Sequence, residues 1–257
     1  MKRIESSQNK IIRLTRSLGM KKYRREHGLF VAEGERLVQD GLKKATPAFL
    51  IIQDSYSLKE PVTCPVYQVP ESLFVQLSDT KSPQGILGVF PTRHQAFAEF
   101  QKGNTLFLNG VSDPGNVGTL LRTAEAAGFS NVVLDGACAD LYHPKTVRST
   151  MSALFNLNLF QCTDSKEGVL LLKEKGLTLV GTALLADSEN LYSLSSLTSP
   201  VGLLIGSEAR GLSKELLPLC HYKVKIPILG KMDSLNAAVA GSVIMYEMVR
   251  REYFEKK

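Results

Sequence analysis

Short apolar runs that alternate with helical patterns constrain the fold of the second half of this chain most strongly. The runs TLFLNGV (105–111), NVVLDG (131–136) and VGLLIG (201–206) are apolar almost throughout. Strands of this kind are typical of a parallel sheet that is covered by helices on both faces. The sequence therefore predicts an α/β domain at residues 103–257. Ligands of such sheets usually bind where loops leave the carboxyl ends of the strands.

Further elements are predicted between and after these runs. Two more strands are expected at 177–185 and 222–228, and a long helix is expected at the C-terminus. Shorter helices are expected at 116–128, 144–156, 168–176 and 213–220. Strands that alternate with helices at this spacing indicate βαβ units.

The first 90 residues show a second, smaller set of alternating elements. A helical stripe predicts an N-terminal helix, and its members are Ile11, Ile12, Leu14 and Leu18. Strands and helices alternate after it, with strands expected at 29–31, 48–54, 62–70 and 85–90. The polar segment 92–103 reads as a connector. We therefore predict a smaller α/β domain at residues 1–95, ahead of the domain at 103–257.

The positive charge of the chain is concentrated at the N-terminus. The net charge is +6, and residues 1–25 contain nine Lys or Arg residues and one Glu. Such a segment suits a polyanion, above all nucleic acid, because each phosphate contact releases condensed counterions. From charge alone, a solvated helix face is an equally good interpretation. A transit peptide is disfavoured, because the apolar stripe leads directly into sequence that looks folded.

Composition and spacing exclude several classes of protein. The four cysteines form no C-x-x-C pair and have no His at metal-ligand spacing, so neither a zinc site nor a disulfide framework is expected. No apolar stretch approaches the ~20 residues that a membrane span requires, and the N-terminus lacks the apolar core of a secretory signal. We expect a soluble, cytoplasmic protein without a metal.

The first of three polar loops at strand ends lies at 109–129. Asn116 follows the turn Asp113-Pro114-Gly115, and its side chain is suited to cap the next helix. Arg122 lies beside the buried face of that helix. A cap and a surface cation explain these two residues as well as a binding site does. The segment lacks both G-x-G-x-x-G and Gly-Lys-Ser/Thr, so a nucleotide phosphate loop is a weak interpretation.

The second polar loop follows the strand at 201–206. Glu208 comes just after the strand end at Gly206, where a plain surface charge is not expected, although a carboxylate there could simply receive backbone N–H groups. Gly206 and Gly211 would let the backbone approach a ligand closely. Ser213 is the expected N-cap of the next helix.

The third polar loop precedes the C-terminal helix. Asp233 or Ser234 is an adequate N-cap, and the small residues at 237–241 could serve only for close helix packing. Helix caps alone do not explain why polar loops recur three times at the ends of parallel strands.

Together the three loops closely resemble the motifs of the SpoU (TrmH-like) RNA ribose methyltransferases, members of the knotted SPOUT class. The matching stretches, in family order, are NVGTLLRTAEAAGF, LLIGSEARGL and IPILGKMDSLNAAVAGSVIMYE. The N-terminal stretch SSQNKIIRLTRSLGMKKYRREHGLFVAEGERLV resembles the substrate-binding domain fused to many members. Departures from the commonest pattern occur around Met151 and Ala238. The resemblance implies a parallel sheet with a trefoil knot, preceded by a ribosomal-protein-like α/β domain.

The resemblance also implies a reaction. Members of this family transfer a methyl group from S-adenosylmethionine to a ribose 2′-hydroxyl, and large-subunit rRNA is the favoured substrate here. A tRNA 2′-O-methyltransferase and a non-catalytic RNA-binding module of the same fold are the alternatives. A nucleotide-dependent oxidoreductase would need a glycine fingerprint that the chain lacks. The sequence does not identify the target nucleotide, or separate a housekeeping enzyme from one that confers antibiotic resistance.

Site residues follow from the motif match. The catalytic set is Asn116, Arg122, Glu208, Ser234 and Asn236. The cofactor-binding set is Gly206, Ile226 and Leu235, and Thr182 is added to it because it lies at the end of its own strand. The basic N-terminal residues expected to contact RNA phosphates are Arg13, Arg16, Lys21, Lys22, Arg24 and Arg25. The family also forms homodimers through the C-terminal domain, with the pocket near the interface.

Overall fold

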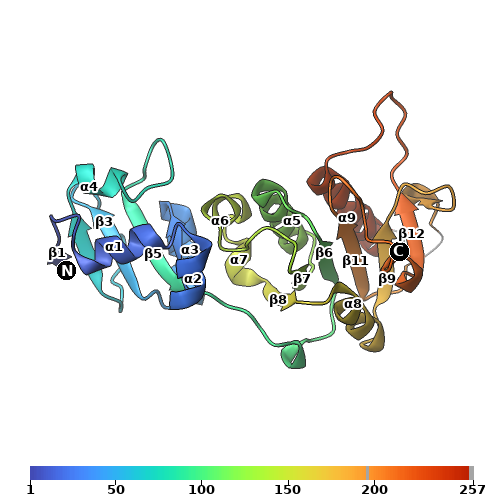
Figure 1. The fold of residues 1–257 in the computed structure, drawn as a ribbon, viewed down its shortest axis with the longest axis horizontal. Coiled ribbons are helices and arrows are strands. Elements are labelled where there is room, and N and C mark those ends of the chain that lie inside the picture. Colours follow the sequence, from blue (N-terminus) through green and yellow to red (C-terminus); the bar gives the residue numbers. More distant parts are fainter. Residues whose placement is uncertain (195–196, 255–257) are drawn as a thin grey trace. The chain divides into compact units, whose positions relative to one another are not determined.

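The computed structural model describes residues 1–194 and 197–254 (Figure 1). Contacts divide the chain into two units, each of which is made of two stretches. The first unit comprises Met1–Arg93 and Asp140–Phe155, and the second comprises His94–Ala139 and Asn156–Lys257. A stretch from the middle of the sequence therefore completes the N-terminal unit.

The first unit is built on a mixed five-stranded sheet in the order β1-β4-β3-β5-β2. The pairs β1–β4 and β3–β4 are parallel, whereas β5 is antiparallel to both β2 and β3. The strands are β1 (Lys2–Arg3), β2 (Leu29–Glu33), β3 (Phe49–Gln53), β4 (Val66–Val69) and β5 (Ile86–Pro91). The helices are α1 (Lys10–Ser17), α2 (Lys21–His27), α3 (Glu35–Lys44), α4 (Glu71–Val75), α6 (Pro144–Thr150) and α7 (Ala153–Asn156). This confirms a smaller α/β unit at the N-terminus.

A buried ion pair attaches the stretch Asp140–Phe155 to the N-terminal helices. The guanidinium of Arg24 donates to the carbonyl oxygens of Leu18 and Gly19 and to Oδ2 of Asp140, each at 2.8 Å. Burial alone would raise the pKa of Asp140, but hydrogen bonds from Arg24 and the Tyr142 N–H outweigh it and lower the pKa. The Arg24 side chain is only 3% exposed. Its role is therefore to hold these two segments together.

The second unit is built on a seven-stranded sheet in the order β10-β12-β9-β11-β6-β7-β8, and every pair in it is parallel. The strands are β6 (Thr105–Asn109), β7 (Asn131–Asp135), β8 (Asn158–Cys162), β9 (Thr178–Thr182), β10 (Glu189–Asn190), β11 (Val201–Gly206) and β12 (Tyr222–Lys225). The helices are α5 (Pro114–Ala126), α8 (Ser165–Glu174) and α9 (Ala237–Phe254), with 3-10 turns η1 (Phe97–Glu99), η2 (Leu191–Ser193) and η3 (Leu217–Leu219). The parallel sheet predicted from the apolar runs is confirmed.

Helices cover both faces of this sheet. Leu204 of β11 belongs to an apolar cluster with Leu172 of α8. Its neighbour Ile205 points to the opposite face, where α9 packs beside α5, and Gly241 of α9 lies against both Leu120 and Ile205. The absence of a side chain at Gly241 lets α9 approach α5 closely.

Three local predictions were wrong. The helix expected at 144–156 is broken into α6 and α7 at Met151, whose φ of 51° is left-handed. The strand β8 was missed, because only Leu159 and Phe160 of its five residues are buried, which makes its apolar run too short to recognise. The helix expected at 213–220 is a turn followed by η3, which contains Pro218, a residue without an N–H to donate.

Within the described residues, no helix is both long and apolar enough to cross a membrane. The same part of the chain holds no group of three or more His, Cys, Asp or Glu side chains that could bind a metal ion. The four cysteines are free thiols.

Candidate functional site

The three polar loops meet at a hydrogen-bonded cluster centred on Asn116. Its Nδ2 donates to Oε1 of Glu208 at 2.5 Å, and its Oδ1 accepts from Nδ2 of Asn236 at 3.1 Å. These residues are 92 and 120 positions away from Asn116 in the sequence. The parallel sheet brings them together, because β6 and β11 are adjacent and parallel and so end at the same edge. Three of the five predicted catalytic residues therefore share one cluster.

Asn116 is available for this cluster because another residue caps its helix. Oδ1 of Asp113 accepts from the Asn116 N–H at 2.9 Å, and α5 begins at Pro114. The interpretation of Asn116 as a helix cap is therefore wrong. Asn116 lies in the first turn, and its side-chain amide uses one donor and its acceptor to join the other two loops.

The C-terminal helix is also capped by a residue other than those expected. Oδ1 of Asn236 accepts from the N–H groups of Ala238 and Val239 at 2.9 and 3.2 Å. Neither Asp233 nor Ser234 is the cap. Asn236 both caps α9 and donates to Asn116, so the start of the helix fixes the third loop against the first.

Arg122 does not join the cluster within one chain. It lies on α5 six residues after Asn116, about 9 Å further along the helix axis and on a different side of the helix. Its side chain is exposed, and its guanidinium makes no hydrogen bond or ion pair with any described residue. The arginine is therefore free to bind an anion.

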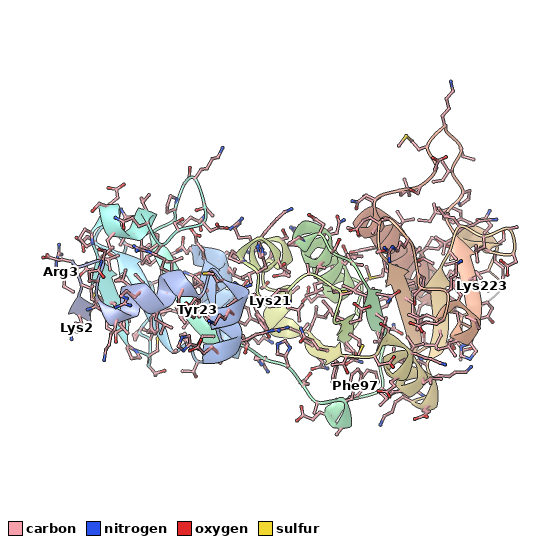
Figure 2. All side chains as sticks on the ribbon, in the orientation of Figure 1. Lys2, Arg3, Lys21, Tyr23, Phe97 and Lys223 are labelled. Carbon is pink, nitrogen blue, oxygen red and sulfur yellow. The ribbon has the colours of Figure 1, made fainter. Side chains whose placement is uncertain are left out.

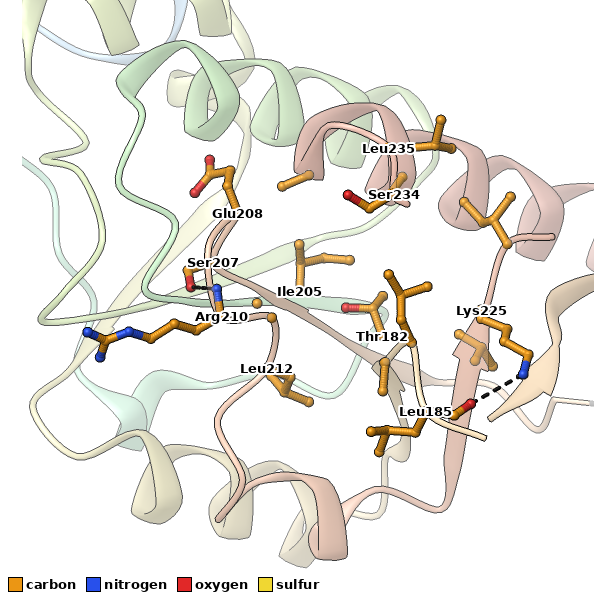
Figure 3. A pocket seen from close by; sticks show the side chains of 18 of the residues that line it. Thr182, Leu185, Ile205, Ser207, Glu208, Arg210, Leu212, Lys225, Ser234 and Leu235 are labelled. Carbon is orange, nitrogen blue, oxygen red and sulfur yellow. Dashed lines mark hydrogen bonds between the residues drawn. The ribbon is translucent and has the colours of Figure 1, made fainter. Parts of the chain in front are cut away.

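A pocket of about 490 Å³ lies beside the cluster, within the size range of small-molecule sites (Figure 3). All four predicted cofactor-binding residues line it: Thr182, Gly206, Ile226 and Leu235. Two predicted catalytic residues, Glu208 and Ser234, line it as well. The loops after β9, β11 and β12 thus form one cavity.

The pocket has an apolar wall and charges of both signs. The larger apolar side chains that the sequence did not single out are Leu184, Leu185, Ile205, Leu212, Leu217, Val224, Ile228 and Ile244. The additional charged residues are Arg210, Lys214, Lys225 and Asp233. Such a lining suits a small molecule that has both an apolar part and charged groups. The sequence could have identified Leu184 and Leu185 by their position just after a strand. They were missed because this strand was predicted to run to residue 185, whereas β9 ends at Thr182.

Two lysines of β12 hold the segment after β9 beside the pocket. Nζ of Lys225 donates to the carbonyl oxygen of Leu185 at 3.2 Å (Figure 3). Nζ of Lys223 forms an ion pair with Asp187. This segment therefore has two attachments to the strand that leads into the third loop.

The loop after β11 folds back tightly on Gly206. A Cβ at Gly206 would lie 2.0 Å from the backbone C of Gly211 and 2.0 Å from the N of Leu212. Backbone hydrogen bonds between Ser207 and Gly211, at 2.8 and 3.1 Å, close the loop. Glycine is required at position 206 because no side chain fits between the strand end and the returning chain.

The predicted RNA-contacting residues lie on α1 and α2 of the first unit, with one correction. Five of them are exposed: Arg13, Arg16, Lys21, Lys22 and Arg25. Arg24 is buried, and its guanidinium is engaged with two carbonyl groups and Asp140, so it is not placed to contact phosphates. Figure 2 labels Lys21 and Tyr23 on α2. Nζ of Lys22 lies 5.6 Å from the centroid of the Tyr23 ring.

Comparisons with known proteins agree over both units. Residues 103–246 match the model of the SpoU rRNA Methylase family, and residues 9–88 match that of the MRM3-like substrate binding domain. The 23S rRNA (guanosine(2553)-2′-O)-methyltransferase RlmP of Bacillus subtilis is 32% identical over 96% of this chain and 99% of its own. An rRNA methyltransferase from Sinorhizobium meliloti, solved with AdoMet bound, has a TM-score of 0.88 at 31% identity and covers 98% of both chains. The SpoU methyltransferase AviRb of Streptomyces viridochromogenes, also solved with AdoMet, has a TM-score of 0.83 at 27% identity over 96% of this chain and 99% of its own.

Replacement of Gly206 by alanine tests the packing of the pocket loop. We expect Gly206→Ala to lower the free energy of unfolding by about 3 kcal/mol, because backbone atoms must move to admit the methyl group. Gly136→Ala is the matched control, since a Cβ there meets nothing within 4 Å. Chemical denaturation measures both, and equal stability of the two variants would contradict the tight return of the chain at Gly206.

Proposed function

This chain belongs to the SpoU rRNA methylase family, and we propose that it methylates a ribose 2′-hydroxyl of large-subunit ribosomal RNA. It is an S-adenosylmethionine-dependent RNA 2′-O-methyltransferase. The observation that carries the choice of substrate is the end-to-end similarity to a 23S rRNA enzyme, which includes the N-terminal unit. We also propose that the protein works in the cytoplasm.

The main requirement of this reaction is that the enzyme aligns the ribose hydroxyl with the methyl group of the cofactor. S-adenosylmethionine, when bound, would supply an electrophilic methyl group on a sulfonium. Transfer to the ribose oxygen would form the O–CH₃ bond, break the S–CH₃ bond with S-adenosylhomocysteine as the leaving group, and release the proton of the hydroxyl. Alignment of two reactants contributes roughly 7–11 kcal/mol in well-oriented systems. The chain must therefore hold the ribose at a fixed place beside the cofactor pocket and ease the loss of the hydroxyl proton.

The pocket beside Asn116 fits the cofactor. The apolar side chains Ile226 and Leu235 would pack against the adenine, and backbone groups after Thr182 and Gly206 would bind its polar edge. The carboxylate and ammonium groups of the methionine part match the mixture of basic and acidic side chains in the lining. AdoMet in two related structures supports this assignment.

We assign the cluster residues by their contacts. Asn116 would orient the ribose, using the amide hydrogen that Glu208 leaves free. Glu208 would fix the second loop to the first, since its carboxylate accepts from Asn116. Asn236, with Ser234 nearby in the same loop, would tie the third loop to the catalytic pocket.

Arg122 would act as a clamp for an anion. A guanidinium stays protonated in proteins, so it is poorly suited to serve as the general base. We propose that it holds the phosphate of the target nucleotide or stabilises the developing alkoxide, with the proton passing to solvent or to a phosphate. Its exposure and lack of partners within the described chain support this role.

A homodimer through the second unit is proposed as the active form. Val239 and Tyr246, seven residues apart on one face of α9, are 50% and 52% exposed. Leu229 and Met232 in the preceding loop are 98% and 75% exposed. A second copy is the natural cover for these apolar side chains, which lie close to the pocket lined by Leu235.

The division of labour between the two parts of the chain is a further proposal. Residues 1–95 would bind RNA and residues 103–257 would carry the reaction, and the two matched family ranges, 9–88 and 103–246, support these bounds. The trefoil knot of the catalytic domain stays a prediction. The tight return of the chain at Gly206 is compatible with it.

Mapping of the modified nucleotide tests the proposed substrate. Purified protein, S-adenosylmethionine and RNA from a strain lacking the gene should yield one new 2′-O-methylated nucleotide in large-subunit rRNA, located by mass spectrometry. Methylation of tRNA alone would favour the tRNA alternative. Cofactor binding without methyl transfer to either RNA would favour a non-catalytic RNA-binding module.

Arg122→Lys tests the clamp. Lysine keeps the charge but loses the planar fork, so we expect kcat to fall about 100-fold while the Kd for S-adenosylmethionine is unchanged. A pH–rate profile should keep its shape, because the proposed clamp takes up no proton from the ribose. Retained activity with a shifted apparent pKa would contradict a clamp that depends on the fork.

The exposed cations of α1 and α2 predict a salt-dependent contact with RNA. Lys21→Gln with Lys22→Gln should reduce the slope of log K against log salt by about 1.5, since each phosphate contact contributes about 0.7–0.9. Lys43→Gln with Lys44→Gln on α3 is the matched control, because these are also adjacent exposed lysines of the first unit. Equal slopes for both variants would exclude α2 as the RNA-binding surface.

A further inference from the structure

A buried carboxylate lies at the carboxyl end of β7. Asp135 is 8% exposed. Its Oδ1 accepts from the backbone N–H groups of Gly110, Ala137 and Cys138 at 3.1, 3.0 and 3.1 Å. Its Oδ2 accepts from Nδ2 of Asn109 at 2.7 Å and from Oγ of Ser165 at 3.0 Å. Asp135 lies outside the three polar loops that the sequence analysis singled out.

Asn109, the last residue of β6, connects that carboxylate to the second polar loop. Its Nδ2 donates to Asp135, and its Oδ1 accepts from the backbone N–H of Ser213 at 2.9 Å. Ser213 ends the loop that carries Glu208. The side-chain amide of Asn109 therefore makes two links: its NH₂ group donates to Asp135 at the end of β7, and its oxygen accepts from the loop after β11.

The same pair also fixes the first polar loop. Gly110, whose N–H donates to Asp135, begins that loop and has a left-handed φ of 69°. The loop continues to Asp113, which caps α5 and so sets the position of Asn116. Both partners of the short Asn116–Glu208 hydrogen bond are thus attached, through a few residues of chain, to Asn109 and Asp135.

We propose that Asn109 and Asp135 are positioning residues, which set the geometry between Asn116 and Glu208 without touching the substrate. The inference rests on the catalytic roles proposed for those two residues. The loop that carries Glu208 is closed by its own backbone hydrogen bonds between Ser207 and Gly211, so it moves as one piece when its end at Ser213 moves. Loss of the link at Asn109 therefore displaces Glu208 and, with it, the amide of Asn116.

An exchange of the two residues tests this link. Asn109→Asp alone places two carboxylates against each other, and Asp135→Asn alone places two amide NH₂ groups against each other. In the double variant, Oδ1 of the new asparagine takes the three backbone N–H groups, its Nδ2 donates to the new aspartate, and that aspartate still accepts from Ser213. The hydrogen bond between the two side chains is restored with donor and acceptor reversed. Oγ of Ser165 lies within 3.4 Å of the exchanged atoms at both positions, so it can donate to the new aspartate instead.

Single-turnover methyl transfer measures the outcome. We expect each single variant to lose at least about 10-fold in the rate of methyl transfer, and the double variant to return to within about 3-fold of the wild type. The Kd for S-adenosylmethionine should change by less than about 3-fold in the double variant. Melting temperatures are measured in parallel, so that rates are compared only between folded proteins.

Ser165→Ala is the matched control. It removes the other donor to Oδ2 of Asp135 and an acceptor 3.4 Å from Nδ2 of Asn109. The bonds from Asn109 to Asp135 and to Ser213 stay in place, so its rate should stay within about 3-fold of the wild type. A double variant that is folded but as slow as the single variants, or one that does not fold, would overturn the inference. Failure of the wild-type protein itself to transfer methyl groups would instead contradict the proposed function.

Discussion

The side-chain amide of Asn116 is the contact on which the proposed site depends. It bonds to both other polar loops, because it offers a donor to Glu208 and an acceptor to Asn236. An ionised carboxylate of the same reach could not satisfy both partners, because it has no hydrogen to donate to Glu208. A single hydrogen bond of this kind is worth only about 1 kcal/mol, so its value lies in alignment of the loops rather than in stability.

The parallel sheet makes that contact possible. Because all strands of the second unit run in one direction, the loops after β6 and β11 leave the same edge, and the cofactor pocket forms there with the loops after β9 and β12. The residues that cap α5 and α9 then determine which side-chain groups remain free to join the cluster around Asn116. Asp113 caps α5 and frees Asn116, whereas Asn236 caps α9 with its oxygen and keeps its NH₂ group for Asn116.

The sequence predicted those parts of the site that local chemistry determines. Apolar runs indicated the strands. The family resemblance of the loops at their ends implied Gly206, Ile226 and Leu235, and Thr182 was added from its place at the end of a strand; all four line the pocket. The rest depends on tertiary contacts that no local pattern encodes. The burial of Arg24 follows from its pairing with Asp140, which is 116 residues away, and charge alone could not separate it from its exposed neighbours. The cap at Asp113 was missed because Asp113 and Asn116 are equally good capping residues by type.

The most direct test of the account is a comparison of cofactor binding and turnover in Asn116→Asp. This substitution keeps the shape of the side chain but replaces the donor to Glu208 with a second carboxylate oxygen. The account predicts a Kd for S-adenosylmethionine within about 3-fold of the wild type and a rate of methyl transfer about 100-fold lower, because a misaligned ribose loses the gain from orientation. A variant that transfers methyl groups at the wild-type rate would show that the cluster of Asn116, Glu208 and Asn236 is not the catalytic centre.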